Sequence, residues 1–524
     1  MAEPIYVTRK DETFSIVDLS EDKALGEELY EFFSFMAPGY QYNKMYKRRL
    51  WNGKLSLFNK HSGALYTGLL PYLRLYADTV AKRPLEGLPS ETRKSLPEGV
   101  LGRFTSSLGL VAHGKPVEPH WFQVDAVTKA LERKRITLLS PTSSGKSMII
   151  YMLTRWYLTV SKGKTLIVVP TVNLVEQMHS DFIDYRGNRK TKTGAGVAEF
   201  DPIYDVHKIK AGQSKTSDCP VIISTWQSIY EMPPEWFEQF SSVICDEAHL
   251  AKAQSIRGIM EKCPHVKNRV ALTGTIEDIK SSKLTVEGLF GPCYQVVKTK
   301  KLMEDGHVSD LDIKIITLTH ETEQRPLDAK STYQEEVDFV VSSEPRNRKI
   351  ARLADKLPGN TMILCNMIDR HLLVLAKVLE EVTTKKVYLV HGKVDAEDRE
   401  TIRQALEKEN NAIILASYGV FSTGVSIRNL QNIIFASPTK SKIRTLQSIG
   451  RVLRLDGKTN KATLWDIADK IVSIKTTGKL SRWENYGIRH LVERMKYYKA
   501  EKFPFEIIPI TLTTKKDAPL AKGL

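Results

Sequence analysis

The feature that most constrains the fold of this chain is an alternation of short β-branched runs with amphipathic helical segments, which occurs in two successive stretches. Such an alternation is typical of parallel α/β sheets, because parallel strands need a crossover connection, usually a helix. The predicted strands are 136–140, 165–170, 221–225, 243–246 and 269–273 in the first stretch, and 361–365, 386–390, 412–417, 432–436 and 462–466 in the second. Open α/β sheets bind ligands beyond the carboxyl ends of their strands, so the residues after each run are the first candidates for chemistry.

The domain organisation follows from the same patterns. They predict an α/β protein with two tandem parallel-sheet domains after a small α+β N-terminal domain, separated from it by a connector rich in Pro, Gly and Ser. The predicted boundaries are 1–85 for the N-terminal domain, 86–116 for the connector, 117–305 and 306–500 for the sheet domains, and 501–524 for a short basic tail.

Composition narrows the class of protein. The net charge of +16 over 524 residues favours a polyanionic partner, although a soluble protein that is merely basic has the same composition. No apolar run reaches the roughly 18 residues of a membrane span, and the first residues carry no secretory signal, so we expect no membrane contact and a cytoplasmic location. The five cysteines show no C-x-x-C spacing, which favours free thiols over a zinc site or disulfides.

The run SPTSSGKS over residues 140–147 follows an apolar strand and opens a helical segment. This context predicts a P-loop whose backbone amides and helix N-terminus cradle the phosphates of ATP, although Ser140 replaces the usual first glycine. Lys146 is expected to reach the β- and γ-phosphates, and Ser147 to hold Mg²⁺. The other residues expected to bind ATP here are Thr142, Ser143, Ser144 and Gly145.

Two further motifs follow in order. Asp246 and Glu247, in the run DEAH after the strand 243–246, are suited to hold Mg²⁺ and to polarise the attacking water, respectively. Taken alone, four such letters also fit a solvated acidic turn. In the second stretch, Arg451 and Arg454 are three residues apart and share one helix face, which suits a γ-phosphate whose charge is redistributing.

With these three motifs in this order, the chain resembles the superfamily-two helicases of the D-E-x-H class, which have two tandem RecA-like domains. The resemblance implies an adenine-reading glutamine at Gln123 and a nucleotide contact at Gly424. It implies coupling of hydrolysis to motion through His249, Thr273, Thr275 and Gln447, and nucleic-acid contacts at Thr171, Thr225 and Trp226. The coupling motif reads TGT over residues 273–275, where SAT is commoner in that class.

Within that class, residues 118–123, 301–306, 417–424 and 446–454 resemble the phage recombination and repair helicases. That resemblance implies an ATP-dependent DNA helicase or translocase that uses Mg²⁺ and acts on branched DNA. Its expected reactions are Holliday-junction branch migration, fork regression and R-loop unwinding on RNA–DNA hybrids, in recombination, repair and replication. For a phage-encoded chain the expected location is the host cytoplasm, and we expect a monomer; the sequence indicates no protein partner.

The N-terminal domain carries the clearest candidate surface for DNA. Between Phe32 and Ala77 there are seven Lys or Arg and no Asp or Glu, with aromatic residues interleaved. Cations neutralise phosphates and aromatic faces stack on bases, so DNA contacts are expected at Lys44, Lys47, Arg48, Arg49, Trp51 and Lys54. The alternative is a small basic domain with an aromatic core, which we prefer for the phenylalanines at 32, 33 and 35. A basic loop at 186–192 fits a DNA clamp and a solvated loop equally well.

Other functions share these motifs. An RNA helicase, the translocating subunit of a restriction enzyme and a nucleic-acid-binding protein switched by ATP without strand separation all remain alternatives. A restriction subunit needs nuclease carboxylates in an extra domain, for which the chain has no room. The other two differ from a DNA helicase in what stimulates ATP hydrolysis and in whether strands separate.

Overall fold

We describe the protein from a computed structural model. It describes residues 3–37, 39–88, 95–186, 199–210, 212–249, 253–275, 280–322, 327–328, 330–392, 394, 396–419, 427, 429–437, 439–453, 461–473 and 483–512. The chain forms two compact units, of which the first ends at Val297 and the second begins at Lys298. Among the described residues, no helix has both the length and the apolar composition needed to cross a membrane.

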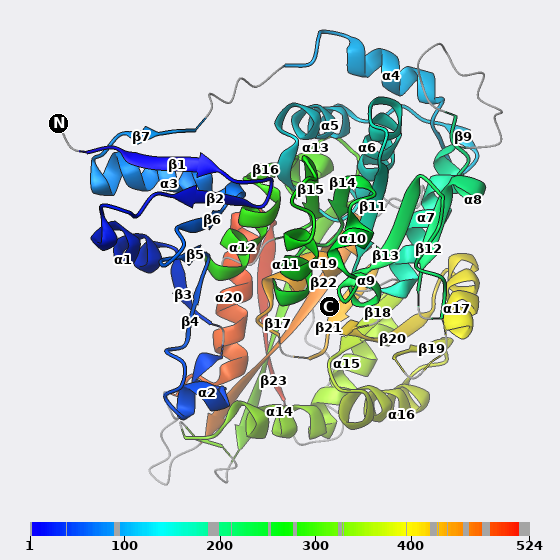
Figure 1. Cartoon of the computed structure of the whole chain (residues 1–524). Helices are drawn as coiled ribbons and strands as arrows, with labels where there is room; N and C mark the ends of the chain where they lie inside the picture. The colour runs from blue at the N-terminus through cyan, green and yellow to red at the C-terminus, as the bar shows by residue number, and fades with distance from the viewer. Residues whose placement is uncertain are drawn as a thin grey trace. The chain divides into compact units, whose positions relative to one another are not determined.

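The first unit contains a seven-stranded parallel sheet in the order β12-β13-β11-β14-β15-β10-β16 (Figure 1). Its strands are β10 (Arg135–Leu139), β11 (Lys164–Val169), β12 (Val206–Ile209), β13 (Val221–Thr225), β14 (Phe240–Cys245), β15 (Asn268–Thr273) and β16 (Cys293–Gln295). The main helices around it are α5 (Trp121–Arg133), α6 (Lys146–Val160), α7 (Val172–Arg186), α11 (Ala253–Glu261) and α12 (Lys280–Phe290). All five predicted strands are present, and the two that the sequence did not reveal are short strands at the sheet edges.

The second unit repeats this architecture in the order β19-β20-β18-β21-β22-β17-β23, again with all strands parallel. Its strands are β17 (Asp310–Thr322), β18 (Thr361–Cys365), β19 (Val387–Val390), β20 (Ile413–Ser417), β21 (Asn432–Phe435), β22 (Lys461–Ser473) and β23 (Phe505–Leu512). The main helices are α14 (Tyr333–Ser342), α15 (Glu344–Lys356), α16 (Leu373–Val382), α17 (Ala396–Lys408), α19 (Lys442–Val452) and α20 (Tyr486–Ala500). The predicted class, two tandem parallel-sheet domains of the RecA type, is confirmed.

Two segments differ from their sequence-based description. The expected tail at 501–524 begins with β23, which pairs with β17 at the edge of the second sheet; Pro509 is tolerated there because an edge strand has a side that needs no amide donor. The expected connector contains the helix α4 (Val100–Leu108), which begins after Gly99 and ends at Gly109. The many glycines and serines of this segment obscure its helical pattern in the sequence. The fold buries the apolar side of the helix, formed by Leu101, Phe104 and Leu108.

The N-terminal part of the first unit is the expected α+β domain. Its five-stranded sheet, in the order β5-β6-β2-β1-β7, packs with the helices α1 (Lys23–Phe32) and α3 (Leu70–Tyr76). The strands are β1 (Ile5–Arg9), β2 (Phe14–Val17), β5 (Phe58–Asn59), β6 (Ala64–Tyr66) and β7 (Leu85–Glu86). A separate antiparallel pair, β3 (Ser34–Met36) and β4 (Lys54–Ser56), forms an arm that ends in the short helix α2 (Lys44–Lys47) (Figure 1).

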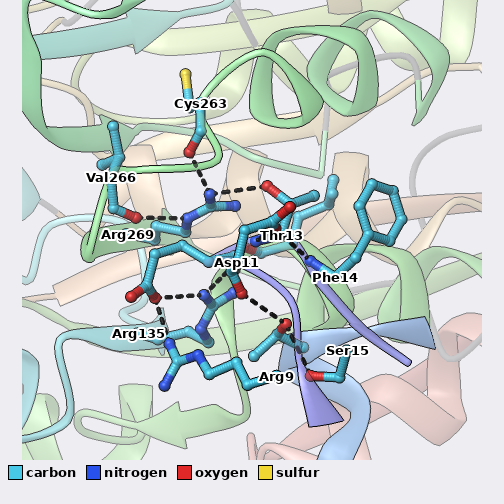
Figure 2. A network of polar contacts seen from close by, with 12 residues as sticks. Arg9, Asp11, Thr13, Phe14, Ser15, Arg135, Cys263, Val266 and Arg269 are labelled. Atoms are coloured by element: carbon cyan, nitrogen blue, oxygen red, sulfur yellow. Dashed lines mark hydrogen bonds and ion pairs between the residues drawn. The ribbon is translucent and has the colours of Figure 1, made fainter. Parts of the chain in front are cut away.

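A network of polar contacts joins this domain to the amino ends of two motor strands (Figure 2). Arg135 and Arg269 are register partners at the starts of β10 and β15. The Arg269 guanidinium is fully buried and donates to the carbonyl of Val266 at 2.9 Å, to the carbonyl of Cys263 and to Thr13 Oγ1 at 2.9 Å. Arg135 donates to the backbone oxygen of Glu12. Burial, and then the charge of Arg135, lowers the pKa of Arg269, so these contacts are needed to offset the cost of burying its charge.

We call this connection between the N-terminal domain and the strands β10 and β15 the joint. Further hydrogen bonds, a close backbone contact and apolar packing extend it. The phenol groups of Tyr66 and Tyr72 donate to Glu261 and Glu287 on the motor side. A Cβ atom at Gly68 would lie only 2.0 Å from the backbone oxygen of Glu287, so only glycine permits this approach. Buried side chains of the N-terminal domain and of the first motor sheet form one continuous apolar core. The N-terminal domain is therefore part of the same folded unit as the first sheet.

We predict that Arg269→Met lowers the free energy of unfolding by about 3 kcal/mol, because it leaves three buried acceptors without their donor. Lys267→Met, which changes an exposed cation two residues earlier, is the matched control and should change it by less than about 0.5 kcal/mol. Urea denaturation of both variants, followed by tryptophan fluorescence, measures the difference. Equal stability of the two variants would show that the joint does not depend on Arg269.

Candidate ATP and nucleic-acid sites

The candidate catalytic residues gather at the carboxyl edge of the first sheet because β10, β14 and β15 are adjacent. The P-loop follows β10, the DEAH run follows β14, and Thr273 ends β15. Backbone bonds fix these segments to one another: Ser140 N–H donates to the Thr273 carbonyl at 2.9 Å, and Ala248 N–H to the Leu272 carbonyl at 3.2 Å. Motifs about 100 residues apart in sequence therefore meet at one edge.

The P-loop has a backbone that its sequence makes possible. Gly145 has a φ of 77°, and a Cβ atom there would lie 2.3 Å from Gln123 Nε2, so the position requires glycine. Gln123 itself donates from Nε2 to the Ser144 carbonyl at 2.9 Å, which links the expected adenine-reading residue to the loop. The hydroxyls of Ser140 and Ser144 lie 2.6 Å apart in the buried base of the loop. This hydrogen bond gives Ser140 a structural role at the position where a glycine is usual.

Lys146 is the first residue of α6, and its ammonium lies at the mouth of the loop. Its Nζ is 3.4 Å from Glu247 Oε1 and 3.5 Å from the Ser140 carbonyl oxygen. A cation held between the loop and the Glu247 carboxylate in this way is suited to neutralise the terminal phosphates of a nucleotide.

The two carboxylates of the DEAH run differ in their surroundings. Burial, and then the charge of Glu247, raises the pKa of Asp246 to about 7, against the lowering effect of Lys146. Asp246 Oδ1 is buried and has no hydrogen-bond partner among the described residues. A buried carboxylate oxygen of this kind fits Mg²⁺, which takes one or two carboxylates and hydroxyl or water oxygens. Glu247 has a φ of +48°, a strained conformation of the kind that functional sites retain.

Ser147 is the other expected Mg²⁺ ligand, and its Oγ lies 2.6 Å from the phenol oxygen of Tyr185 on α7. Sequence reasoning missed Tyr185, since nothing in the pattern around it differs from an ordinary helix. The donor set of Ser147 and Asp246 fits Mg²⁺, which when bound would neutralise charge on the β- and γ-phosphates.

The expected coupling residues of the first unit are in contact. His249 Nδ1 lies 2.6 Å from Thr273 Oγ1, and the Thr273 hydroxyl donates to the Thr275 carbonyl at 2.8 Å. Because that hydroxyl proton is already used, the histidine must carry its own proton on Nδ1. Burial lowers the pKa of His249, which keeps the ring neutral. A side-chain hydrogen bond therefore links the DEAH run to the end of β15.

The three expected nucleic-acid contacts on this sheet divide into two groups. Thr171 is half-buried just before α7, and its hydroxyl accepts from the Leu174 amide at 3.4 Å. Thr225 is buried, with its hydroxyl 2.9 Å from Ser228 Oγ. Trp226 was expected to contact DNA, but its side chain is only 6% exposed and packs in the core. Stacking on a base requires an open ring face, so Trp226 serves as an anchor for its helix turn.

In the second unit, Gln447 is buried within α19, and Arg451 lies on the same helix. The side chain of Arg451 lies outside what the structure describes, as do Arg454 and Gly424. The roles expected for the two arginines and for Gly424 therefore stay predictions.

The N-terminal arm presents the expected basic surface. Lys44, Lys47, Arg48 and Arg49 are exposed, and none forms an ion pair within the described parts of the chain. Lys54 instead pairs with Glu31, and Trp51 donates from its ring nitrogen to the Lys54 carbonyl at 2.9 Å, so both help to build the arm. Of the basic loop at 186–192, only Arg186 is described, and it pairs with Asp201 at 2.9 Å.

Two RecA-like sheets, a P-loop facing a DEAH run and a coupled threonine motif together define a superfamily-two helicase motor. Three family models match consecutive parts of the chain. They are "DNA helicase UvsW, N-terminal" over residues 5–83, "Type III restriction enzyme, res subunit" over 116–278, and "Helicase conserved C-terminal domain" over 346–456.

The chain belongs to the UvsW family of ATP-dependent DNA helicases. It is 35% identical over 95% of its length to the "ATP-dependent DNA helicase uvsW" of Enterobacteria phage T4, covering 98% of that protein. The crystal structure of T4 UvsW matches with a TM-score of 0.51 at 32% identity, covering 98% of this chain and all of that one. The restriction-modification enzyme LlaBIII bound to DNA matches with a TM-score of 0.54 at 16% identity, over 76% of this chain and 32% of that one, and shares the fold alone. The prediction of an ATP-dependent, nucleic-acid-binding helicase is confirmed.

We predict that Glu247→Gln lowers kcat for ATP hydrolysis by at least about 100-fold while ATP affinity is retained, because the amide keeps the shape and removes the charge that polarises water. Steady-state hydrolysis and binding of a fluorescent ATP analogue measure the two quantities. Glu235→Gln, at an exposed position of the same domain, should change neither. Normal turnover of Glu247→Gln would assign the catalytic base elsewhere.

We predict that Thr273→Val leaves ATP hydrolysis within about threefold of wild type but lowers strand separation about tenfold. Valine keeps the volume but removes the hydrogen bonds of the Thr273 hydroxyl with His249 and with the Thr275 carbonyl. Hydrolysis and unwinding are measured on the same DNA. Thr137→Val is the matched control, since the buried hydroxyl of Thr137 bonds to the Gly291 carbonyl at 2.8 Å and does not contact the DEAH run. If both variants unwind DNA equally well, the His249–Thr273 contact does not couple hydrolysis to motion.

Proposed function

We propose that this helicase remodels branched DNA, with the motor sheets moving along one part of the substrate while the N-terminal arm holds another. The observation that carries the proposal is the exposed group of four cations at Lys44, Lys47, Arg48 and Arg49, which form no ion pair with any residue that the structure describes. It belongs to a domain fixed by a buried joint to β10 and β15. Such a surface has no part in ATP hydrolysis, and its charge suits phosphates.

The placement of the two surfaces supports a substrate with more than one arm. The joint is at the amino ends of β10 and β15, whereas the P-loop and Thr273 are at their carboxyl ends. A five-residue strand spans about 17 Å, so DNA that touches the arm and the motor edge together must extend past a whole sheet. Forks and four-way junctions offer separate duplex arms for such contacts, and RNA–DNA branches in R-loops do as well.

In the reaction that we propose, Lys146 binds the terminal phosphates and Glu247 polarises the attacking water. Ser147 and Asp246 would hold Mg²⁺, and Arg451 and Arg454 would stabilise the charge of the transferring phosphoryl group. His249 and Thr273 would then couple the loss of the γ-phosphate to movement of the segments that contact nucleic acid. We further propose that the protein acts as a monomer in the host cytoplasm.

The direct test compares the DNA-stimulated ATPase on duplex, forked, four-way and RNA–DNA substrates of equal length. The proposal expects the highest stimulation on forked and four-way DNA. Strongest stimulation by single-stranded RNA would favour an RNA helicase, and nucleotide-dependent binding without strand separation would favour a switch.

We predict that the charge reversals Lys47→Glu, Arg48→Glu and Arg49→Glu, made together, weaken binding to branched DNA but spare the basal ATPase. The slope of log K against log salt should become shallower by about one unit per lost phosphate contact. Fluorescence anisotropy over a range of salt concentrations measures both effects. Deleting residues 1–85 is the poorer test, because it would expose Arg269 and the shared apolar core.

The matched control reverses three other exposed cations of the same domain, Lys23, Arg74 and Lys82, with the same change in net charge. This control should retain most of the affinity for branched DNA. If both triple variants bind equally well and with equal salt slopes, the arm is a solvated basic surface and the proposal rests on the motor alone.

A further inference from the structure

The arm of the N-terminal domain ends in exposed apolar side chains, which its expected role in binding phosphates does not require. Tyr42, Met45 and Leu50 are 77%, 48% and 66% exposed, and we call these three residues the tip cluster. Several large apolar side chains exposed within one short segment favour a surface that contacts a partner. They lie within nine consecutive residues at the end of β3 and β4, around α2 (Figure 1).

The fold of the tip holds the cluster outside. Asn43 caps α2 by accepting from the Met45 amide at 2.9 Å, and the Leu50 amide donates to the Met45 carbonyl at 2.9 Å, which brings these two apolar residues together. Inside the tip, the rings of Tyr40 and Tyr46 pack edge to face with centroids 4.8 Å apart. These two rings are half-buried against each other, whereas the side chains of the tip cluster stay exposed.

Glycine permits this packing. At Gly53, which has a φ of 78°, an added Cβ atom would lie 2.8 Å from both Met36 Cε and Tyr40 Cδ2. The close approach of the returning strand therefore fixes the shape of the tip. A surface of defined shape loses less conformational entropy when it binds a partner than a loose loop does.

Charge identifies the class of partner. The cluster alternates in sequence with Lys44, Lys47, Arg48 and Arg49, and residues 32–77 contain no Asp or Glu. The nearby acids are already engaged, since Glu31 pairs with Lys54 and Glu27 with Lys60. Against a second copy of this basic tip the like charges would repel, whereas cations around apolar groups complement the phosphates and base faces of nucleic acid.

We propose that the tip cluster is a base-contacting subsite, in which Tyr42 and Leu50 cover the base faces that are exposed where a DNA duplex ends at a branch point. This inference rests on the proposed action on branched DNA and deepens it. Inside a continuous duplex each base pair is covered by its neighbours, so an apolar tip gains nothing there. At a branch the last pair of each arm presents an open face, and the flanking cations hold the adjacent phosphates.

The subsite accounts for discrimination that cations alone cannot supply. Phosphate contacts are nearly the same on a duplex and on a branch, so they raise affinity for both. An open base face is available at a branch but not along the interior of a continuous duplex. The cations therefore set overall affinity and the tip cluster sets the preference for branched over continuous DNA.

The test uses the full-length protein carrying Tyr42→Ala, Leu50→Ser or both. Affinities for a four-way junction and for a continuous duplex of equal length are measured by anisotropy. In the double variant the ratio of junction affinity to duplex affinity should fall about tenfold, while the duplex affinity and the salt slope stay unchanged. Tyr6→Ala with Leu75→Ser, two residues 50% and 53% exposed elsewhere in the domain, is the matched control and should keep the wild-type ratio.

A second measurement reports contact directly. A 2-aminopurine placed in the last base pair before the branch should change its fluorescence on binding the wild-type protein, and the double variant should abolish that change. The proposal is overturned if the double variant keeps both the wild-type affinity ratio and the wild-type 2-aminopurine response. It is also overturned if the double variant loses the same affinity for the duplex as for the junction. If Leu50→Ser instead changes the oligomeric state in sedimentation, the cluster contacts a second copy and the proposal is wrong. The proposed function is tested separately: it would be refuted if forked and four-way DNA did not stimulate the ATPase of the wild-type protein more than duplex DNA does.

Discussion

The parallel pairing of β10 with β15 is the interaction on which the first unit depends. Its register runs from Arg135 opposite Arg269 to Leu139 opposite Thr273. One end of this strand pair receives the N-terminal domain through two arginines, and the other end carries the P-loop and the coupling threonine. Because paired strands in a buried sheet are stiff, the N-terminal domain and the segments that follow β10 and β15 are attached to one rigid frame.

The ATP site carries costs that the surrounding sheet offsets. Asp246 is a buried carboxylate with a raised pKa, and Glu247 has a left-handed backbone; both features destabilise the nucleotide-free fold. Lys146 partly compensates the two charges. Such a site is stabilised most by a ligand that brings positive charge to Asp246 and negative charge to Lys146. A nucleotide bound together with Mg²⁺ would supply both charges.

The second sheet is held by buried ion pairs that serve as anchors. Asp469 on β22 accepts from Arg346 on α15 at 2.7 Å and is 2.9 Å from His320 on β17. Burial raises the pKa of Asp469, but the Arg346 charge and the His320 hydrogen bond outweigh it and hold that pKa at about 2. Asp466, on the same strand, is paired with the buried Arg494 of α20 at 2.8 Å. These pairs tie helices on the sheet to one long strand and contact no expected ligand.

The sequence by itself determined the parts that depend on local pattern. Alternating strands and helices predicted the sheets, the residues after the strands predicted the P-loop and Glu247, and the resemblance to helicases predicted Thr273. Only tertiary structure decided which side chains are covered, since Trp226 is expected to contact DNA and Arg269 only to begin a strand, whereas the fold buries both. The joint, the strand β23 and the outward-facing tip of the arm depend on contacts between residues far apart in the chain. Such contacts leave no periodic trace in a single sequence, because each partner satisfies only its own local pattern.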